Sequence, residues 1–147
     1  MISQRKRLDD IHYLGYSTYG MLHALNEYET ELLSGWEEIY KRGQLTLWIL
    51  LALLDGPKHM AAVKDYIQAH TQNMLSADDQ SMYRALRRYH ETDLVAYTTQ
   101  QIPNGPDRKV YALTATGRHV LHHFVRRNMP ALRTQPMITK IIKEENI

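Results

Sequence analysis

A stretch of polar and basic side chains between residues 80 and 88 has the spacing of one exposed helix face. When Met82 is placed at the centre of the buried face, the helical period turns six side chains outward or to the flanks. These six residues are Gln80, Ser81, Tyr83, Arg84, Arg87 and Arg88. An amide can pair with an adenine edge, a guanidinium with guanine or phosphate, and a hydroxyl with phosphate oxygens. This pattern favours contact with DNA over reaction chemistry.

A second polar group lies in a turn-rich segment, residues 102–107, between two short runs of strand-forming residues. The runs at 94–99 and 109–113 predict a β-hairpin. The tip of this hairpin and its second strand carry Asn104, Arg108 and Lys109. These side chains can hold phosphate groups without reading base sequence, so the hairpin is a candidate phosphate clamp beside the basic helix.

The elements that position these groups are predicted to be helices. Segments 44–54, 58–70 and 77–92 have helical periodicity, and Ser76 is the expected N-cap of the third, with Asp79 in the capping-box position. After the hairpin we expect a helix capped by Thr114 or Thr116 and ended by Pro130. Its expected inner face carries the apolar residues Val120, Leu121, Phe124 and Val125. A short last helix is predicted from Pro136.

The N-terminal part of the chain carries an apolar seam at intervals of three and four residues, which predicts an amphipathic helix. The seam consists of Met21, Leu25, Tyr28, Leu32, Trp36 and Ile39. We expect this helix to begin near Ser17 or Thr18 and to end at Gly43. It is acidic, because residues 9–40 include seven Asp or Glu and no Lys or Arg.

Residues 84–128 have the opposite charge, with eight Lys or Arg against three Asp or Glu. A basic half beside an acidic half is what a DNA-binding face with a separate assembly face would produce. Ordinary solvated helix surfaces explain the charges equally well. The order of elements is more specific: it predicts a mainly α protein with a small β-hairpin wing, a winged helix-turn-helix with an extra N-terminal helix and a C-terminal dimerisation helix.

This organisation divides the 147 residues into three parts. We expect residues 1–40 to form an acidic helical extension for dimerisation, residues 41–114 the DNA-binding domain, and residues 115–147 C-terminal dimerisation helices. The expected dimer interface consists of Leu25, Leu32, Trp36, Leu121, Phe124 and Val125. The seam of the first helix would cover the helix after the wing in a second copy.

Other chemistry finds little support. The chain has no cysteine, which excludes disulfides, thiol nucleophiles and thiolate zinc sites. It has no P-loop, glycine-rich dinucleotide fingerprint, HExxH or strained nucleophile turn, so we expect no catalytic residues, no cofactor and no enzyme activity.

His119 and His123 have the spacing of a metal pair, but no third ligand lies nearby in sequence. We therefore expect surface histidines and no metal site. The longest apolar run, residues 45–54, has about half the length that a helix needs to cross a bilayer, so we expect a cytoplasmic protein without membrane contact.

Three separate segments resemble regulators of the PadR family. Residues 81–88, Ser-Met-Tyr-Arg-Ala-Leu-Arg-Arg, resemble the family's recognition helix, Thr-Leu-Tyr-Pro-Ala-Leu-Arg-Arg. Residues 105–114, followed by Gly117-Arg118, resemble its Gly-Pro-x-Arg-Lys-x-Tyr-x-Leu-Thr wing, and residues 55–59 resemble its Gly-Pro-x-His turn. The resemblance covers about residues 42–128. This chain departs from the family pattern at Arg84, where proline is usual, and at Gln80, where glycine is usual.

The resemblance implies a transcriptional regulator, usually a repressor, that binds double-stranded DNA at a palindromic operator as a homodimer. Position by position, it carries a DNA-contact role over to Ser81, Tyr83, Arg87, Arg88, Arg108 and Lys109. It also implies a possible small aromatic effector. Trp36 and Trp48 could line a pocket for one, although core or interface packing is the simpler interpretation.

A different class of function stays open. Asp78 and Asp79 stand at the start of the expected recognition helix, where they would repel phosphates unless they serve the helix itself. The alternative is therefore a winged-helix protein-interaction module that has lost DNA binding.

Overall fold

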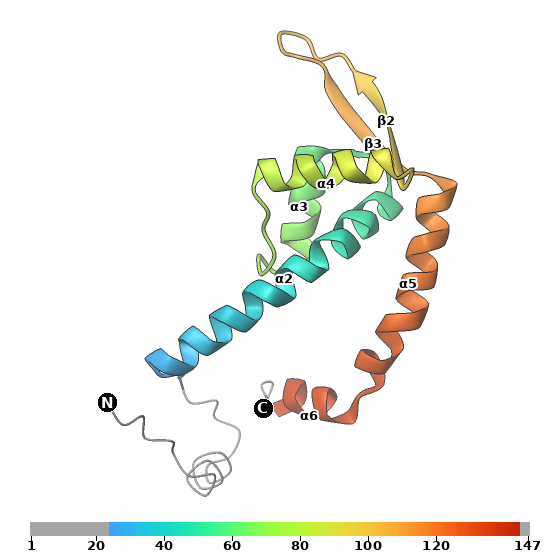
Figure 1. Cartoon of the computed structure of the whole chain (residues 1–147). Coiled ribbons are helices and arrows are strands. Elements are labelled where there is room, and N and C mark those ends of the chain that lie inside the picture. The colour runs from blue at the N-terminus through green and yellow to red at the C-terminus, as the bar shows by residue number, and fades with distance from the viewer. Residues whose placement is uncertain (1–23, 145–147) are drawn as a thin grey trace, which may run out of the picture.

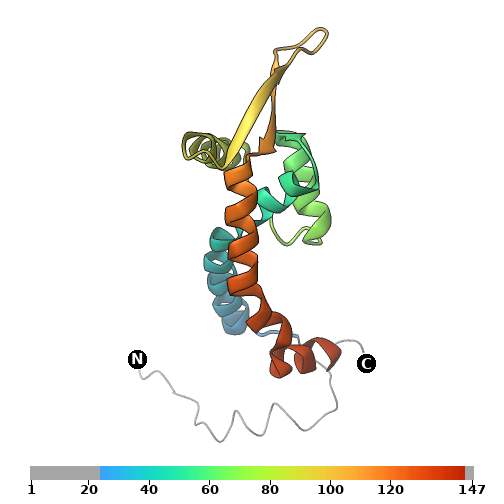
Figure 2. The same cartoon turned by 90° about the vertical axis from the view of Figure 1, so that its right-hand side faces the viewer.

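The computed structural model describes residues 24–144, which form five helices and a three-stranded antiparallel sheet (Figure 1). In chain order the elements are α2 (Glu27–Asp55), β1 (Lys58–His59), α3 (Met60–His70), α4 (Asp79–Glu91), β2 (Val95–Gln100), β3 (Arg108–Leu113), α5 (Ala115–Thr134) and α6 (Pro136–Glu144). The β2–β3 hairpin projects from the helices beside α4. Figure 2 shows α5 running from the base of the hairpin in roughly the opposite direction, with α6 turning aside at its end. The predicted mainly α, winged helix-turn-helix fold is confirmed.

Helix α2 is one continuous helix, so the prediction that Gly43 separates two helices is wrong. A glycine in a helix costs only about 1 kcal/mol. Burial of the apolar residues that follow it outweighs that cost, and ion pairs Glu37–Lys41 and Glu38–Arg42 bridge successive turns just before Gly43. The helix is capped at Asn26, whose side chain accepts from the backbone N–H of Glu29 at 2.8 Å. The predicted start at Ser17 or Thr18 lies outside the described residues.

The hydrophobic core lies where the C-terminal half of α2 meets α3, α4 and the base of the wing. Its largest fully buried side chains are Ile49, Val63, Met82, Leu86, Val95 and Leu121. The inward side chains of α4, which are Met82, Ala85, Leu86 and Tyr89, are all buried in this core, and the Tyr89 hydroxyl also shares a 2.6 Å hydrogen bond with the Thr46 hydroxyl of α2. This hydrogen bond joins the buried face of α4 directly to α2.

The sheet contains a third strand, β1, that the sequence pattern does not predict. Residues Lys58 and His59 pair with Tyr111 and Val110 of β3, so the helix predicted over 58–70, which is α3, begins at Met60 rather than at Lys58. The hairpin strands lie within one residue of the predicted ranges, and in the register Tyr97 stands opposite Tyr111. The extra strand anchors the wing to the turn after α2.

Two predicted helix ends are corrected. The N-cap of α4 is Asp78 and not Ser76, so the capping box with Asp79 does not form. Pro130 lies inside α5, which continues to Thr134. A proline removes one backbone hydrogen bond, and the position is exposed, so water can reach the carbonyl left without a donor.

The junction between the wing and α5 is tightly fixed. Thr114 caps α5, as one of the two predicted alternatives, by accepting from the backbone N–H of Gly117 at 2.9 Å. The Thr114 hydroxyl also donates to the carbonyl of Asp93 at 2.6 Å. A Cβ atom at Gly117 would collide with the carbonyl oxygen of Leu94, so only glycine lets α5 approach the start of β2 this closely.

Candidate nucleic-acid interface

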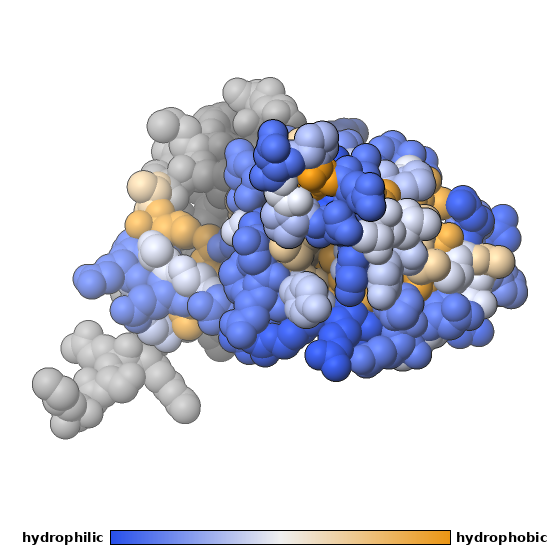
Figure 3. All heavy atoms as spheres, turned by 90° about the horizontal axis from the view of Figure 1, so that it is seen from above, coloured by the Kyte–Doolittle hydropathy of each residue, from blue (hydrophilic) through white to orange (hydrophobic). Residues whose placement is uncertain are grey.

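The outward face of α4 is exposed as the helical period predicts. Met82, Ala85, Leu86 and Tyr89 are buried, whereas the predicted DNA-contact residues of this helix are exposed or, for Ser81, half-buried. The inward stripe therefore holds the helix against the core and leaves a basic face in solvent. Viewed from the side of the wing and α4, the surface is mostly hydrophilic with scattered apolar residues (Figure 3).

The two acidic residues at the start of α4 serve the protein itself. Asp78 accepts from the backbone N–H and the hydroxyl of Ser81, both at 2.8 Å. These hydrogen bonds lower the pKa of Asp78 below its ordinary value. Asp79 forms a 2.6 Å ion pair with Lys64 of α3. Both carboxylates are thus occupied by capping and pairing, and the Ser81 hydroxyl proton is already donated.

The three arginines of α4 differ in their surroundings. Arg87 donates through Nε to Glu91 at 3.1 Å, an exposed pair one turn apart. The guanidinium of Arg88 lies over the ring of Tyr89, 5.4 Å from its centroid. Arg84 is exposed and has no hydrogen bond or ion pair within the described chain. Arg84 therefore presents its whole guanidinium group to an incoming base edge or phosphate.

The wing presents its cations along β3. Arg108 donates through Nε to the side-chain oxygen of Gln100 on β2 at 2.8 Å, which holds it across the hairpin. The ammonium group of Lys109 lies 4.4 Å from the centroid of the Tyr97 ring, and no carboxylate within residues 24–144 pairs with it. Asn104 occupies the hairpin tip with a φ of 64°, a left-handed conformation that asparagine tolerates in turns. It is exposed, but the structure does not bring it to α4.

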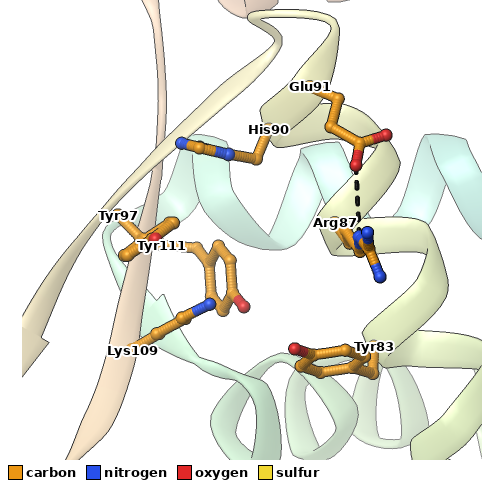
Figure 4. A pocket seen from close by; sticks show the side chains of 7 residues that line it. All are labelled: Tyr83, Arg87, His90, Glu91, Tyr97, Lys109 and Tyr111. Carbon is orange, nitrogen blue, oxygen red and sulfur yellow. Dashed lines mark hydrogen bonds and ion pairs between the residues drawn. The ribbon is translucent and has the colours of Figure 1, made fainter.

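A cavity of about 200 Å³ lies between α4 and the base of the wing (Figure 4). Its lining residues are Tyr83, Arg87, His90, Glu91, Tyr97, Lys109 and Tyr111. The close-up shows Tyr83, Arg87 and Lys109, three of the predicted DNA-contact residues, facing the same space from two elements. The fold thus combines the separate predictions for the helix and the hairpin into one site.

Four residues of this cavity were missed as site residues: His90, Glu91, Tyr97 and Tyr111. His90 and Glu91 could have been predicted from the sequence, because the helical period places them on the same face of α4 as Tyr83 and Arg87. Tyr97 and Tyr111 became neighbours only through the hairpin register, with ring centroids 5.8 Å apart. Burial raises the pKa of Tyr111, so its hydroxyl keeps its proton and can donate a hydrogen bond.

The residues expected at a dimer interface fall into two groups. Leu25, Leu32, Trp36 and Phe124 are exposed, with Trp36 at 72% and Phe124 at 45%. Leu121 is buried in the core of its own chain and Val125 is half-buried against that core. On α5, the predicted inner face is thus split, because Val120 and Phe124 lie in solvent in a single copy.

The two tryptophans do not line the cavity. Trp48 packs against the core and donates to the side-chain oxygen of Gln44 at 3.2 Å. Trp36 stands on the exposed part of α2, about three turns before it. No helix among residues 24–144 is long and apolar enough to cross a membrane.

The family model described as the transcriptional regulator PadR-like family matches residues 49–123, from the C-terminal half of α2 to the first turns of α5. The matched segment contains the whole of α4, the wing and the cavity between them. A search of the curated proteins found no significant match.

Several solved structures share the fold. A PadR-like transcription factor from Bacteroides fragilis is 27% identical, with a TM-score of 0.55 over 71% of this chain and 98% of its own. A PadR-family regulator from Eggerthella lenta is 20% identical, with a TM-score of 0.59 over 75% and 99%. Bacillus subtilis PadR, solved in complex with operator DNA, is 23% identical, with a TM-score of 0.54. That alignment covers 58% of this chain and only 49% of the B. subtilis protein.

Proposed function

Because this chain belongs to the PadR-like family of transcriptional regulators, a family of regulators and not of enzymes, we propose that it is a sequence-specific DNA-binding repressor. In this proposal α4 enters the major groove and the wing holds the adjacent backbone. The protein acts as a homodimer, so the operator is a pseudo-palindrome with half-sites about 34 Å apart.

The observation that carries the proposal is the shared orientation of cations from two elements. Arg87 of α4 and Lys109 of β3 line one cavity, and Arg84 and Arg88 are exposed on the same helix. A groove-binding helix needs such a flanking cation, because phosphate contacts fix its register while base contacts specify sequence. Residues from α4 and the wing therefore have complementary roles: we assign Arg84 and Gln80 to bases, and Lys109 and Arg108 to phosphates.

The acidic residues that suggested loss of DNA binding have a different explanation. The Asp78 carboxylate caps α4, and the Asp79 carboxylate forms an ion pair with Lys64, with Nζ and Oδ1 2.6 Å apart. An N-cap carboxylate also interacts favourably with the positive end of the helix dipole. This leaves a protein-interaction module without its main support, and a DNA-binding role is favoured.

The exposed apolar residues support the homodimer. Six apolar side chains of α2 stand in solvent in one copy: Tyr28, Leu32, Leu33, Trp36, Ile39 and Tyr40; Leu25, just before the helix, is exposed as well. Val120 and Phe124 of α5 and the apolar residues of α6 are exposed as well. A single copy rarely leaves this much contiguous apolar surface uncovered. We propose that α2, α5 and α6 of a second copy cover it, with residues 1–40 and 115–147 as the dimerisation segments.

A small aromatic effector is part of the proposal. The cavity beside the wing offers the rings of Tyr83, Tyr97 and Tyr111 for stacking, with Arg87 and Lys109 at their edges. A molecule held there would occupy residues assigned to DNA. The effect expected of such a ligand is therefore competitive release from the operator.

The test is a fluorescence-anisotropy titration of the full chain with mixed genomic DNA fragments at two salt concentrations, with sequencing of the retained fragments. Salt-dependent binding that enriches a palindromic motif supports the proposal. Arg84→Ala is then expected to weaken operator binding by about 1–3 kcal/mol and to relax the preference at one base pair per half-site. Absence of binding at low salt by an intact dimer would instead indicate the protein-interaction module.

A further inference from the structure

Three histidines lie close together on the exposed side of α5, outside the DNA-contact face. His119 and His123 are one helical turn apart, and His122 lies beside them. Leu121, two residues from each member of the pair, is buried in the core. The helical period therefore turns His119 and His123 to the side of α5 opposite the core, where solvent reaches both rings.

The Nε2 atoms of His119 and His123 lie 3.2 Å apart. The two rings meet edge to face, with an interplanar angle of 80° and centroids 4.7 Å apart. Two imidazoles bound to one tetrahedral metal ion at about 2.0–2.1 Å have their nitrogens about 3.3 Å apart. The pair thus already has the bite of a bidentate metal ligand, and small side-chain rotations would aim both lone pairs at one ion.

We propose that His119 and His123 form a binding site for a divalent transition metal ion of the Zn²⁺, Ni²⁺ or Cu²⁺ class. In the free protein one ring donates its Nε2 proton to the other. On binding, the donor ring carries its proton on Nδ1 instead, and both Nε2 lone pairs bind the ion. No charge change on the rings is needed.

The surroundings select against harder cations. Between residues 115 and 134, α5 has no Asp or Glu and carries four arginines, Arg118, Arg126, Arg127 and Arg133. Mg²⁺ and Ca²⁺ require oxygen ligands, whereas imidazole nitrogen suits Zn²⁺, Ni²⁺ and Cu²⁺. Within residues 24–144 no group of three or more His, Cys, Asp or Glu side chains is placed to hold a metal ion, so the coordination positions beyond the two imidazoles would belong to water or to a ligand from outside the chain.

The bound ion would link two successive turns of α5, close to the Thr114 cap that joins this helix to the wing. An unfolded chain does not hold the two rings in this geometry. Binding therefore stabilises the folded helix, and the ion should raise the thermal unfolding temperature of the protein. This effect does not depend on whether the protein binds DNA.

The test is isothermal titration calorimetry of the full, tag-free, chelator-treated chain with Ni²⁺, together with electron paramagnetic resonance of the Cu²⁺ form. We expect one strong site per chain, two nitrogen ligands on Cu²⁺, and no binding of Mg²⁺. His119→Ala and His123→Ala should each weaken Ni²⁺ binding at least about tenfold. Losing only a residue that hydrogen-bonds to a metal ligand already weakens metal binding by about tenfold or more, and these variants lose a ligand itself.

The matched control is His122→Ala, which removes another exposed ring from the same helix. It should leave both the Ni²⁺ affinity and the metal-induced rise in unfolding temperature unchanged. Circular dichroism checks that each variant keeps its helices. Equal losses in all three variants, or undiminished binding by His123→Ala, would overturn the assignment of the site to the 119–123 pair.

Discussion

Replacing Lys109 with alanine isolates the phosphate-binding role that we propose for the wing. Lys109 is exposed, has no carboxylate partner within residues 24–144, and lies 4.4 Å from the Tyr97 ring centroid. Its loss removes one cation–π contact, worth about 0.5–1 kcal/mol at an exposed site, so the fold should persist. What changes is the electrostatic part of DNA binding.

The size of the change follows from counterion release. A homodimer loses two phosphate contacts, and each contributes about 0.9 to the slope of log affinity against log salt, so the slope becomes shallower by about 1.8. The ratio of wild-type to variant affinity for DNA is therefore about twelvefold larger at about 50 mM salt than at about 200 mM salt. The deficit should be the same on operator and unrelated DNA, because phosphates carry no sequence.

The assay is anisotropy titration at four salt concentrations with operator and scrambled duplexes of equal length. Lys140→Ala is the matched control, since it removes the same charge from exposed α6, at the other end of α5 from the wing. The reasoning fails if the two variants have equal slopes, or if Lys109→Ala weakens operator binding selectively.

Three further predictions concern the scaffold. Gly117→Ala should lower stability by about 1–3 kcal/mol in urea unfolding, because its Cβ collides with the Leu94 carbonyl oxygen; an unchanged midpoint would contradict this close approach. Asp78→Ala should lower the melting temperature at neutral pH. Hydrogen bonds from Ser81 lower the pKa of Asp78, so its stabilisation is present above the ordinary aspartate pKa and is lost as pH falls through the folded-state value. The melting-temperature gap between wild type and Asp78→Ala should therefore close in acid, whereas a gap that widened would refute it. Trp36→Glu should shift the protein from dimer to monomer in sedimentation velocity, and a dimer that persists would exclude this face of α2.

The element order and the buried stripe of α4 could be predicted from the sequence, because both depend on local periodicity. Met82 and Leu86 recur at helical spacing, and the turn cluster at 102–107 separates two strand-forming runs. The same periodicity placed Arg84 and Arg87 on the exposed face. Once the inward stripe of a helix is known, the directions of its other side chains follow.

Helix ends and breaks were predicted less well, because they depend on competing local energies. Gly43 looks like a breaker by propensity, yet burial of the apolar residues after it keeps α2 continuous. Ser76 and Asp78 are both good capping residues. The choice of Asp78 reflects its two hydrogen bonds with Ser81 and the pairing of Asp79 with Lys64, a contact between α4 and α3 that no local pattern reveals.

The sequence by itself determined the residue types of the proposed DNA-contact face and the family pattern that carries them. Tertiary structure alone decided which of them share a site. The strand pairing of Lys58–His59 with β3 and the register that sets Tyr97 opposite Tyr111 place Lys109 beside Arg87, although 22 positions separate them in the chain. Side-chain type and helical period are local properties, whereas such a juxtaposition depends on packing between segments far apart in sequence.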